Sequence, residues 1–229
     1  MKPIIIGNPN KNKLLQKKLI SRINIDKKYL NSHLNFRNEI LKKINKNMKV
    51  LDVGKSMRDD FIKISCKEII TLDINIFEDY PDVQFDLSEK IEIEKTELNQ
   101  KFDVIICLAV LEHVYNPFNA IQNLRKMLNH GGVIYGYVPF LYHYHAPKDL
   151  NFQDYYRFTK DGLAYLLKDF KKVKIYPVRG RLSSAMHILF GSLWKKTFEK
   201  FKVNLILDSF FSKEKNSKQT GGFNFIAFK

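Results

Sequence analysis

Cysteine is scarce in this 229-residue sequence, which contains only Cys66 and Cys107. Two cysteines are too few for a disulfide framework or a zinc site, and this fits a reducing compartment. Long apolar runs are also missing, since the longest, Val104 to Leu111, is far short of a membrane span. The apolar run at Ile4 to Ile6 is too short for a signal peptide. We therefore expect a cytoplasmic protein, or at most one attached to the inner face of a membrane.

Acidic residues are outnumbered, with 24 Asp and Glu against 39 Lys and Arg and a formal charge of +15. Lys, Ile and Asn are abundant throughout, so the excess can reflect a composition typical of AT-rich genomes. An anionic partner, such as nucleic acid or a membrane surface, explains it equally well. The 45% of apolar residues suffices for a core, and the length favours one domain with elaborations.

Glycine is sparse at the one turn that has the pattern of a nucleotide site. Residues 48–57 have the pattern of a buried strand that ends in a turn at Gly54 and leads towards a helix. A dinucleotide site needs G-x-G-x-x-G to seat its pyrophosphate, but Ser56 takes the second glycine position and the third is lost. Asp73 ends the next strand, about 20 residues on, where such folds place an acid on ribose hydroxyls. The turn therefore argues against a dinucleotide.

Strand and helix patterns alternate in the middle of the chain, which predicts an α/β fold with a largely parallel sheet. Strands are expected at 49–53, 68–73, 83–86, 102–108 and 132–138, and later at 172–178 and 222–228. Helices are expected at 58–67, at 117–129 and from 159 to about 169.

Four acids stand at or beside predicted strand ends, namely Asp52, Asp73, Asp86 and Glu112. Each alone is most simply a turn cap or a surface acid. All four at one edge of a sheet are much harder to obtain by chance. Carboxylates suit the amino group and the sulfonium of S-adenosylmethionine, which has no phosphate and needs one close backbone approach, at Gly54. We therefore expect this cofactor at that edge.

Four motifs extend this interpretation over residues 48–138. In chain order they are Val50-Leu51-Asp52-Val53-Gly54, Leu72-Asp73-Ile74, Phe102 to Val114, and Leu128-Asn129-His130-Gly131-Gly132. They resemble the motifs of class I S-adenosylmethionine-dependent methyltransferases, most specifically at Val110-Leu111-Glu112-His113-Val114. The resemblance implies a Rossmann-like, seven-stranded, mostly parallel sheet with a reversed last strand and helices on both faces. It also implies methyl transfer from a sulfonium, with S-adenosylhomocysteine as product.

Later segments, at Pro139-Phe140, His145 and Asp154-Tyr155-Tyr156-Arg157-Phe158-Thr159, resemble a bacterial branch of that family. Members of this branch are often found with surface-glycan or small-metabolite pathways. The resemblance therefore implies an acceptor of that kind, for example in surface polysaccharide biosynthesis.

The resemblance also implies a set of cofactor-binding residues: Asp52, Gly54, Ser56, Asp73, Ile74, Asp86, Leu87, Leu108, Ala109 and Glu112. In this set Asp73 would hold the ribose, and Asp86 and Leu87 would lie by the adenine. The chain departs from the family at Lys55, Ser56 and Arg58, where small residues or glycine are usual.

A base that deprotonates a hydroxyl acceptor would assist the reaction. The candidate catalytic residues are His145 and His113, with His143 third. His113 could instead cap the turn after its strand, and the other two could only bind substrate.

A substrate wall is expected from His143, Tyr155, Tyr156 and Arg157, because the Arg157 guanidinium offers a fork for a carboxylate or phosphate. Arg157 could instead pair with Asp154 or Asp161 as a structural tie. No metal ligands are predicted.

Three segments flank the motifs. Residues 1–47 are expected as a basic helical extension of a methyltransferase domain at 48–229. Within that domain we expect a substrate loop at 139–159 and a helical insertion at 181–220. One side of the inserted helix carries Met186, Phe190, Trp194, Phe198 and Phe201. This helix either packs on the protein or touches anionic lipid.

The sequence thus predicts a methyltransferase that acts on oxygen or nitrogen of a small-molecule or glycan-related acceptor. One alternative is an RNA methyltransferase, motivated by the charge. Against it, we find neither an Asn-Pro-Pro-Tyr-type motif nor a Pro-Cys nucleophile, so nucleic acid is the less favoured partner. The other alternative is a cofactor-free scaffold at a membrane or in a glycan-assembly complex.

Overall fold

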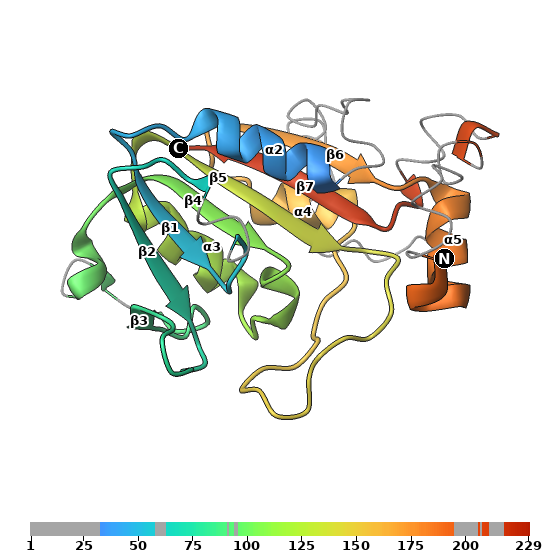
Figure 1. Ribbon diagram of the computed structural model, residues 1–229, viewed down its shortest axis with the longest axis horizontal. Helices are drawn as coiled ribbons and strands as arrows, with labels where there is room; N and C mark the ends of the chain where they lie inside the picture. The colour runs from blue at the N-terminus through green and yellow to red at the C-terminus, as the bar shows by residue number, and fades with distance from the viewer. Residues whose placement is uncertain are drawn as a thin grey trace, which may run out of the picture.

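The computed structural model describes residues 33–57, 63–90, 92–93, 96–194, 206, 208–210 and 218–229. Its centre is a seven-stranded sheet in the order β3-β2-β1-β4-β5-β7-β6 (Figure 1). The strands are β1 Lys49–Val53, β2 Glu68–Asp73, β3 Val83–Gln84, β4 Phe102–Leu108, β5 Leu128–Pro139, β6 Lys172–Val178 and β7 Gly222–Phe228. The pairs from β3 through β5 are parallel, and β7 runs antiparallel to β5 and β6. The predicted mostly parallel sheet with a reversed last strand is confirmed.

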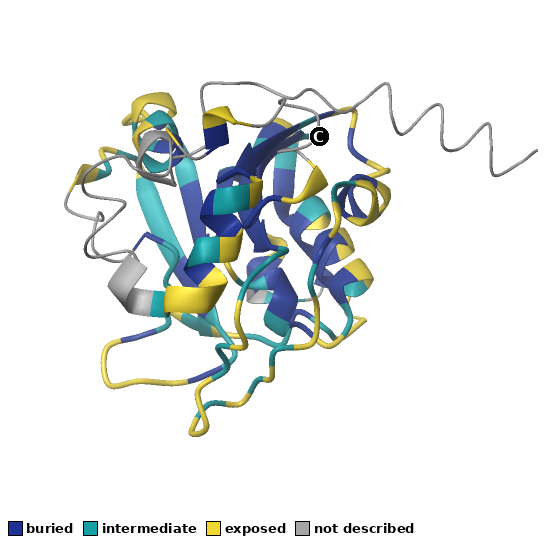
Figure 2. Ribbon diagram, turned by 90° about the vertical axis from the view of Figure 1, so that its right-hand side faces the viewer, coloured by how far each residue is buried: buried dark blue, intermediate teal, exposed yellow. Residues whose placement is uncertain are grey.

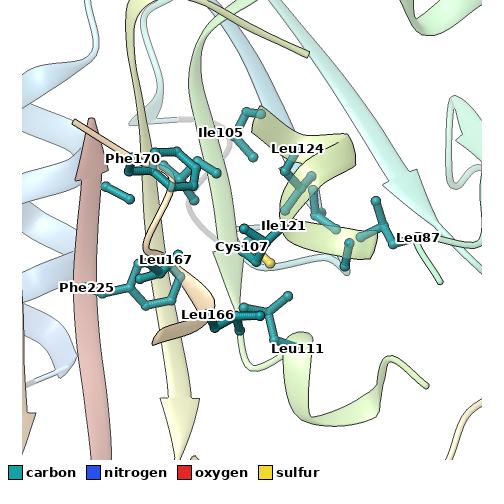
Figure 3. Packing of buried hydrophobic residues seen from close by; sticks show 14 of the residues in the cluster. Leu87, Ile105, Cys107, Leu111, Ile121, Leu124, Leu166, Leu167, Phe170 and Phe225 are labelled. Carbon is teal, nitrogen blue, oxygen red and sulfur yellow. The ribbon is translucent and has the colours of Figure 1, made fainter. Parts of the chain in front are cut away.

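The apolar strands bury both of their faces, as parallel strands between helices do. In β4, Ile105 and Cys107 belong to one buried cluster, whereas Val104 and Ile106 belong to the other. Figure 3 shows the first cluster, in which side chains of the sheet meet those of two helices. Buried residues accordingly concentrate in the sheet and on the helix sides that face it (Figure 2).

The helices of the described chain are α2 His33–Lys43, α3 Pro117–Met127, α4 Lys160–Leu166 and α5 Arg181–Trp194. Helix α3 begins where the sequence predicts, because Asn116 Oδ1 accepts a hydrogen bond from Asn119 N at 3.1 Å and Pro117 is the first helical residue. Thr159 Oγ1 caps α4 by accepting a hydrogen bond from Gly162 N at 3.0 Å. Helices α3 and α4 contribute to the first cluster and α2 to the second, so both faces of the sheet are covered.

The predicted helix at 58–67 is wrong over residues 64–67, which are not helical, whereas 58–62 lie outside the described residues. Lys67 N donates to Met48 O at 2.9 Å, so the chain already runs beside the start of β1 at that point. The predicted strand at 83–86 is shortened to two residues. There, Asp86 Oδ1 accepts a hydrogen bond from Ser88 N at 2.8 Å and turns the chain.

The flanking segments are described only in part. Phe36 and Ile40 of α2 are fully or almost fully buried against the sheet, so this part of 1–47 packs on the protein. The expected first helix of 1–47 lies outside the described residues. Helix α5 contains a break at Gly191, and Phe198 and Phe201 lie beyond the described part. No helix in the described chain is long and apolar enough to cross a membrane.

The loop between β5 and α4 extends past the carboxyl ends of the strands (Figure 1). Backbone hydrogen bonds hold it there: Asn151 N donates to Asn75 Oδ1 at 2.8 Å, and Tyr155 N donates to Glu112 O at 2.8 Å. These bonds place the loop over the edge of the sheet where the predicted site residues lie.

Candidate active site

A cavity of about 170 Å³ lies at the carboxyl edge of β1, β2 and β4, under the β5–α4 loop. It is lined by Val53, Gly54, Leu72, Asp73, Ile74, Phe85, Asp86, Leu87, Ser88, Ala109, Val110, His113, Val114, Tyr115, Asn151, Phe152 and Tyr155. Five separate segments of the chain therefore build one pocket. Such a crevice at the carboxyl ends of the strands is the usual ligand site of open α/β sheets.

The Gly54 turn keeps one wall of this cavity free of side chains. Gly54 has a φ of 69°, and its N–H donates to Leu72 O at 2.9 Å. A Cβ at this position would lie 2.5 Å from Val110 Cγ2, which also lines the cavity. Only glycine therefore fits this turn without strain, and its backbone can approach a ligand closely.

Two of the predicted acids, Asp73 and Asp86, lie on the cavity wall, and Ile74 and Leu87 lie beside them. Asp73 Oδ1 accepts a hydrogen bond from Asn75 N at 2.9 Å, so the carboxylate is held by the turn after β2. Ala109, another predicted cofactor residue, also lines the cavity and has a φ of 57°.

Asp52, Ser56 and Leu108 do not line the cavity. Ser56 Oγ donates to Val53 O and accepts from Leu108 N at 2.8 Å, so it ties β1 to β4. Asp52 is fully buried and accepts a hydrogen bond from Met57 N at 3.3 Å. Burial raises the pKa of Asp52 to about 7. The cofactor roles of these three residues remain predictions.

Lys55, which replaces a small residue of the family pattern, is directed away from the cavity lining. Its ammonium lies 3.3 Å from the centroid of the Phe77 ring and 4.6 Å from that of Tyr80. Its backbone N–H donates to Tyr80 Oη at 2.6 Å. The Lys55 ammonium therefore makes a cation–π contact.

Glu112, His113 and His145 converge beside the cavity and form what we call the Glu–His–His cluster. His113 Nε2 lies 3.2 Å from His145 Nε2, and Glu112 Oε1 lies 3.9 Å and 3.6 Å from these two atoms, respectively. Glu112 is fully buried, and its carboxylate oxygens have no hydrogen-bond partner within the described chain. The nearby Glu112 carboxylate raises the pKa of His145. Of the three, only His113 lines the cavity.

Asp154 and Arg157 support this cluster from the loop. Asp154 Oδ2 accepts a hydrogen bond from His145 N at 2.9 Å and from Arg157 Nη2 at 2.6 Å. Burial favours a raised pKa for Asp154, but these hydrogen bonds outweigh it and lower the pKa to about 2. Arg157 also donates to the carbonyl oxygens of Tyr142 and His143. The structure thus shows the Arg157–Asp154 tie, and a substrate role for Arg157 remains a prediction.

The other predicted substrate residues are dispersed around the loop. Tyr155 lines the cavity, whereas Tyr156 Oη donates to Tyr115 O at 2.8 Å. His143 stacks on Tyr142 with ring centroids 4.3 Å apart, outside the cavity lining. Burial lowers the pKa of His143, and the nearby His145 adds to the shift. Their substrate contacts remain predictions.

Several lining residues were not anticipated from the sequence. Phe85 and Val110 adjoin predicted positions just after strands, so closer attention to strand ends could have found them. Asn151 and Phe152 come from the loop, where no motif marks them.

Residues 26–170 match the model of a family described as "Methyltransferase domain". A 36-residue segment is 44% identical to ubiquinone biosynthesis O-methyltransferase from Glaesserella parasuis serovar 5 (strain SH0165), covering 16% of this chain and 15% of that enzyme.

Solved structures share the fold at low identity. A SAM-dependent methyltransferase from Archaeoglobus fulgidus aligns with a TM-score of 0.50 at 18% identity, covering 85% of this chain and 91% of that one. Phosphoethanolamine N-methyltransferase 2 from Haemonchus contortus, solved with phosphomonomethylethanolamine and S-adenosylhomocysteine, aligns with a TM-score of 0.52 at 13% identity. That alignment covers 85% of this chain and 52% of the other. At these identities the likeness shows a common fold.

Proposed function

The chain belongs to the methyltransferase domain family, and we propose that it transfers a methyl group from S-adenosylmethionine to an oxygen or nitrogen of a small-molecule or glycan-related acceptor. S-adenosylmethionine is the cofactor consistent with this family and with the fold's crystallised neighbours. The observation that carries the proposal is the cavity lined by Gly54, Asp73 and Ala109, and also by His113.

The residues present fit an adenosyl group. Gly54 leaves backbone exposed on one wall, and Asp73 offers carboxylate oxygen to ribose hydroxyls. Apolar side chains of Ile74, Phe85 and Leu87 supply surfaces on which a flat base can pack. Lys55 does not obstruct the pocket, because its ammonium lies over Phe77.

The bound cofactor supplies a methyl group already activated by its sulfonium. The chain's own part is to bind, orient and exclude water, and orientation of two reactants can contribute roughly 7–11 kcal/mol. Phe152 and Tyr155 of the loop lie over the cavity and would shield it from solvent. His113 forms part of the cavity wall, and this supports a role of the Glu–His–His cluster in taking the proton of an acceptor hydroxyl.

Calorimetric titration with S-adenosylhomocysteine tests the proposal. We expect the wild type to bind, and we expect Asp73→Ala to bind about 10–100-fold more weakly, because a charge-assisted hydrogen bond contributes about 1.5–3 kcal/mol. Asp79→Ala serves as the matched control, since Asp79 is exposed and does not line the cavity. Binding that is absent in the wild type would refute the enzymatic proposal and favour a scaffold.

We also propose that the enzyme works in the cytoplasm and contacts the inner face of the membrane. Helix α5 exposes Ile188, Leu189 and Phe190, with 73% of Leu189 accessible, and this supports the proposal. We expect Leu189→Asp to reduce co-sedimentation with anionic liposomes several-fold. The control is Ile76→Asp, because Ile76 is also an exposed apolar residue but lies on the β2–β3 connection. Equal sedimentation of all three proteins would contradict membrane contact through α5.

A further inference from the structure

We propose that Glu112, His113 and His145 bind one divalent transition-metal ion beside the cofactor cavity. We further infer that the ion activates a hydroxyl acceptor, a step that rests on the methyl transfer proposed above. The sequence alone predicted no metal ligands, whereas the fold brings these three residues together from two separate segments.

The spacing of the three donor atoms fits one ion. The separations of 3.2, 3.6 and 3.9 Å define a triangle with a circumscribed radius of about 2.1 Å. This equals the length of zinc bonds to imidazole nitrogen and carboxylate oxygen, about 2.0–2.2 Å. An ion near the centre of this triangle would therefore lie within bonding distance of all three donors.

The tautomers of both histidines leave the required lone pairs available. His113 Nδ1 lies 2.9 Å from Gln153 O, and His145 Nδ1 lies 3.2 Å from His143 O and 3.1 Å from Asp154 Oδ2. These oxygens only accept hydrogen bonds, so each Nδ1 carries a hydrogen, and in the neutral form of both rings each Nε2 is bare and can bind a metal ion. The two Nε2 atoms then face each other at 3.2 Å, and a cation between them removes the repulsion of their lone pairs.

Glu112 provides an independent indication. Its side chain is fully buried, and neither carboxylate oxygen finds a hydrogen-bond donor among the residues that the structure describes. Apart from the two imidazoles at 3.6 and 3.9 Å, nothing in the described chain compensates this buried carboxylate, and a bound cation would do so. Its backbone carbonyl accepts hydrogen bonds from Tyr155 N and Tyr156 N, so the loop fixes Glu112 in place.

Residues behind the ligands complete the site. Metal-binding histidines almost always donate their other ring N–H to a carboxylate or carbonyl group, which fixes their orientation. Asp154 plays this part for His145, and Arg157 holds Asp154 in turn through a 2.6 Å hydrogen bond. The Gln153 carbonyl does the same for His113.

The donor set indicates the kind of ion and the kind of acceptor. Two imidazoles and one carboxylate suit zinc, cobalt, manganese or iron better than magnesium or calcium. Because His113 also lines the cavity, an open coordination position can face the acceptor. Such an ion lowers the pKa of a bound hydroxyl, whose proton then passes to solvent. The oxygen forms the new O–C bond while the S–C bond breaks and sulfur keeps the electron pair. The acceptor is therefore inferred to be a hydroxyl compound.

Cobalt titration of the tag-free protein, after treatment with a chelator, tests the site. We expect one Co²⁺ per chain, detected by its visible absorption and by calorimetry. We expect His113→Ala, His145→Ala and Glu112→Gln to lose this absorption, and Asp154→Asn to bind roughly 10–100-fold more weakly. His130→Ala is the matched control, since His130 is exposed at the opposite end of the sheet and should bind like the wild type.

Binding of S-adenosylhomocysteine, measured in the same samples, separates the two proposals and reports folding. If the wild type binds the nucleoside but no Co²⁺, the metal proposal is overturned and methyl transfer stands, with a proton shared between the histidines. If His145→Ala and Glu112→Gln bind Co²⁺ as tightly as the wild type, the ligand assignment is overturned. If neither the wild type nor any variant binds S-adenosylhomocysteine, the proposed function itself is contradicted.

Discussion

The two halves of the candidate site are held together in different ways. The donor half, around Gly54 and Asp73, is fixed mainly by backbone hydrogen bonds between neighbouring strands, such as Gly54 N to Leu72 O. The acceptor half, around the Glu–His–His cluster, depends on side-chain contacts between η5 Leu111–His113 and the β5–α4 loop. The difference teaches that the parallel sheet itself shapes the donor half, whereas the acceptor half depends on a few charged side chains.

The largest effect that separates the two halves is expected from removing a residue of the Glu–His–His cluster that does not line the cavity. We expect His145→Ala to reduce turnover by roughly 10²–10⁴-fold, because activation of the acceptor hydroxyl is lost. Affinity for S-adenosylhomocysteine should stay within a few-fold of the wild type, since His145 lies outside the cavity lining. Turnover at the wild-type rate would contradict the assignment of His145 to acceptor activation.

Asp52 should make the stability of the donor half depend on pH. Its pKa of about 7 in the folded state exceeds the usual value of 3.8 because of burial, so the folded state retains a proton that the unfolded state loses. Stability should therefore fall as pH rises from about 4 to 7, by on the order of 4 kcal/mol.

The Asp52→Asn variant should abolish this decline, which chemical denaturation at several pH values can measure. Parallel stability curves for the wild type and the variant across pH 4–8 would contradict the assignment. His130→Ala, whose ring is exposed and does not line the cavity, controls for the general effect of substitution.

A methyl group added at Gly54 tests whether a change in the donor half leaves the acceptor half unaffected. Gly54→Ala places a Cβ 2.5 Å from Val110 Cγ2 at a φ of 69°. We expect a loss of about 1–3 kcal/mol of stability and weaker nucleoside binding. Binding of Co²⁺ should stay unchanged, and a matching loss of both ligands would show that the two halves are coupled.

The smallest expected effect concerns a residue outside both halves. Thr159→Ala removes the cap of α4 and should lower stability by about 1 kcal/mol in a denaturant titration. Neither nucleoside nor Co²⁺ affinity should change. A change in either would indicate that α4 sets the position of the loop more strongly than its contacts suggest.

The strands and the donor half of the site could be predicted from the sequence, whereas the acceptor half could not. The strands at 49–53, 68–73, 102–108, 172–178 and 222–228 were predicted with the bounds that the structure shows, because apolar runs and glycine turns mark them. Five predicted cofactor residues, other than Gly54, line the cavity for the same reason: Asp73, Ile74, Asp86, Leu87 and Ala109. Each lies at the end of a strand or within three residues after it, so local pattern was sufficient.

The acceptor half could not be assembled from local pattern. The sequence singled out Glu112, His113 and His145, but it assigned the glutamate to the cofactor and the histidines to base catalysis. Their convergence depends on a loop whose path is set by distant hydrogen bonds, such as Asn151 N to Asn75 Oδ1. No periodicity encodes such a path, and the same holds for Phe152 on the cavity wall.

A crystal structure of the protein with S-adenosylhomocysteine is the most direct test of the central claim, that the carboxyl edge of the sheet holds an adenosyl sulfonium donor. We predict ligand density between Gly54 and Asp73, with the ribose hydroxyls at the Asp73 carboxylate and the sulfur directed towards His113. Density in another place, or a cavity that stays free of the nucleoside at saturating concentration, would contradict the account.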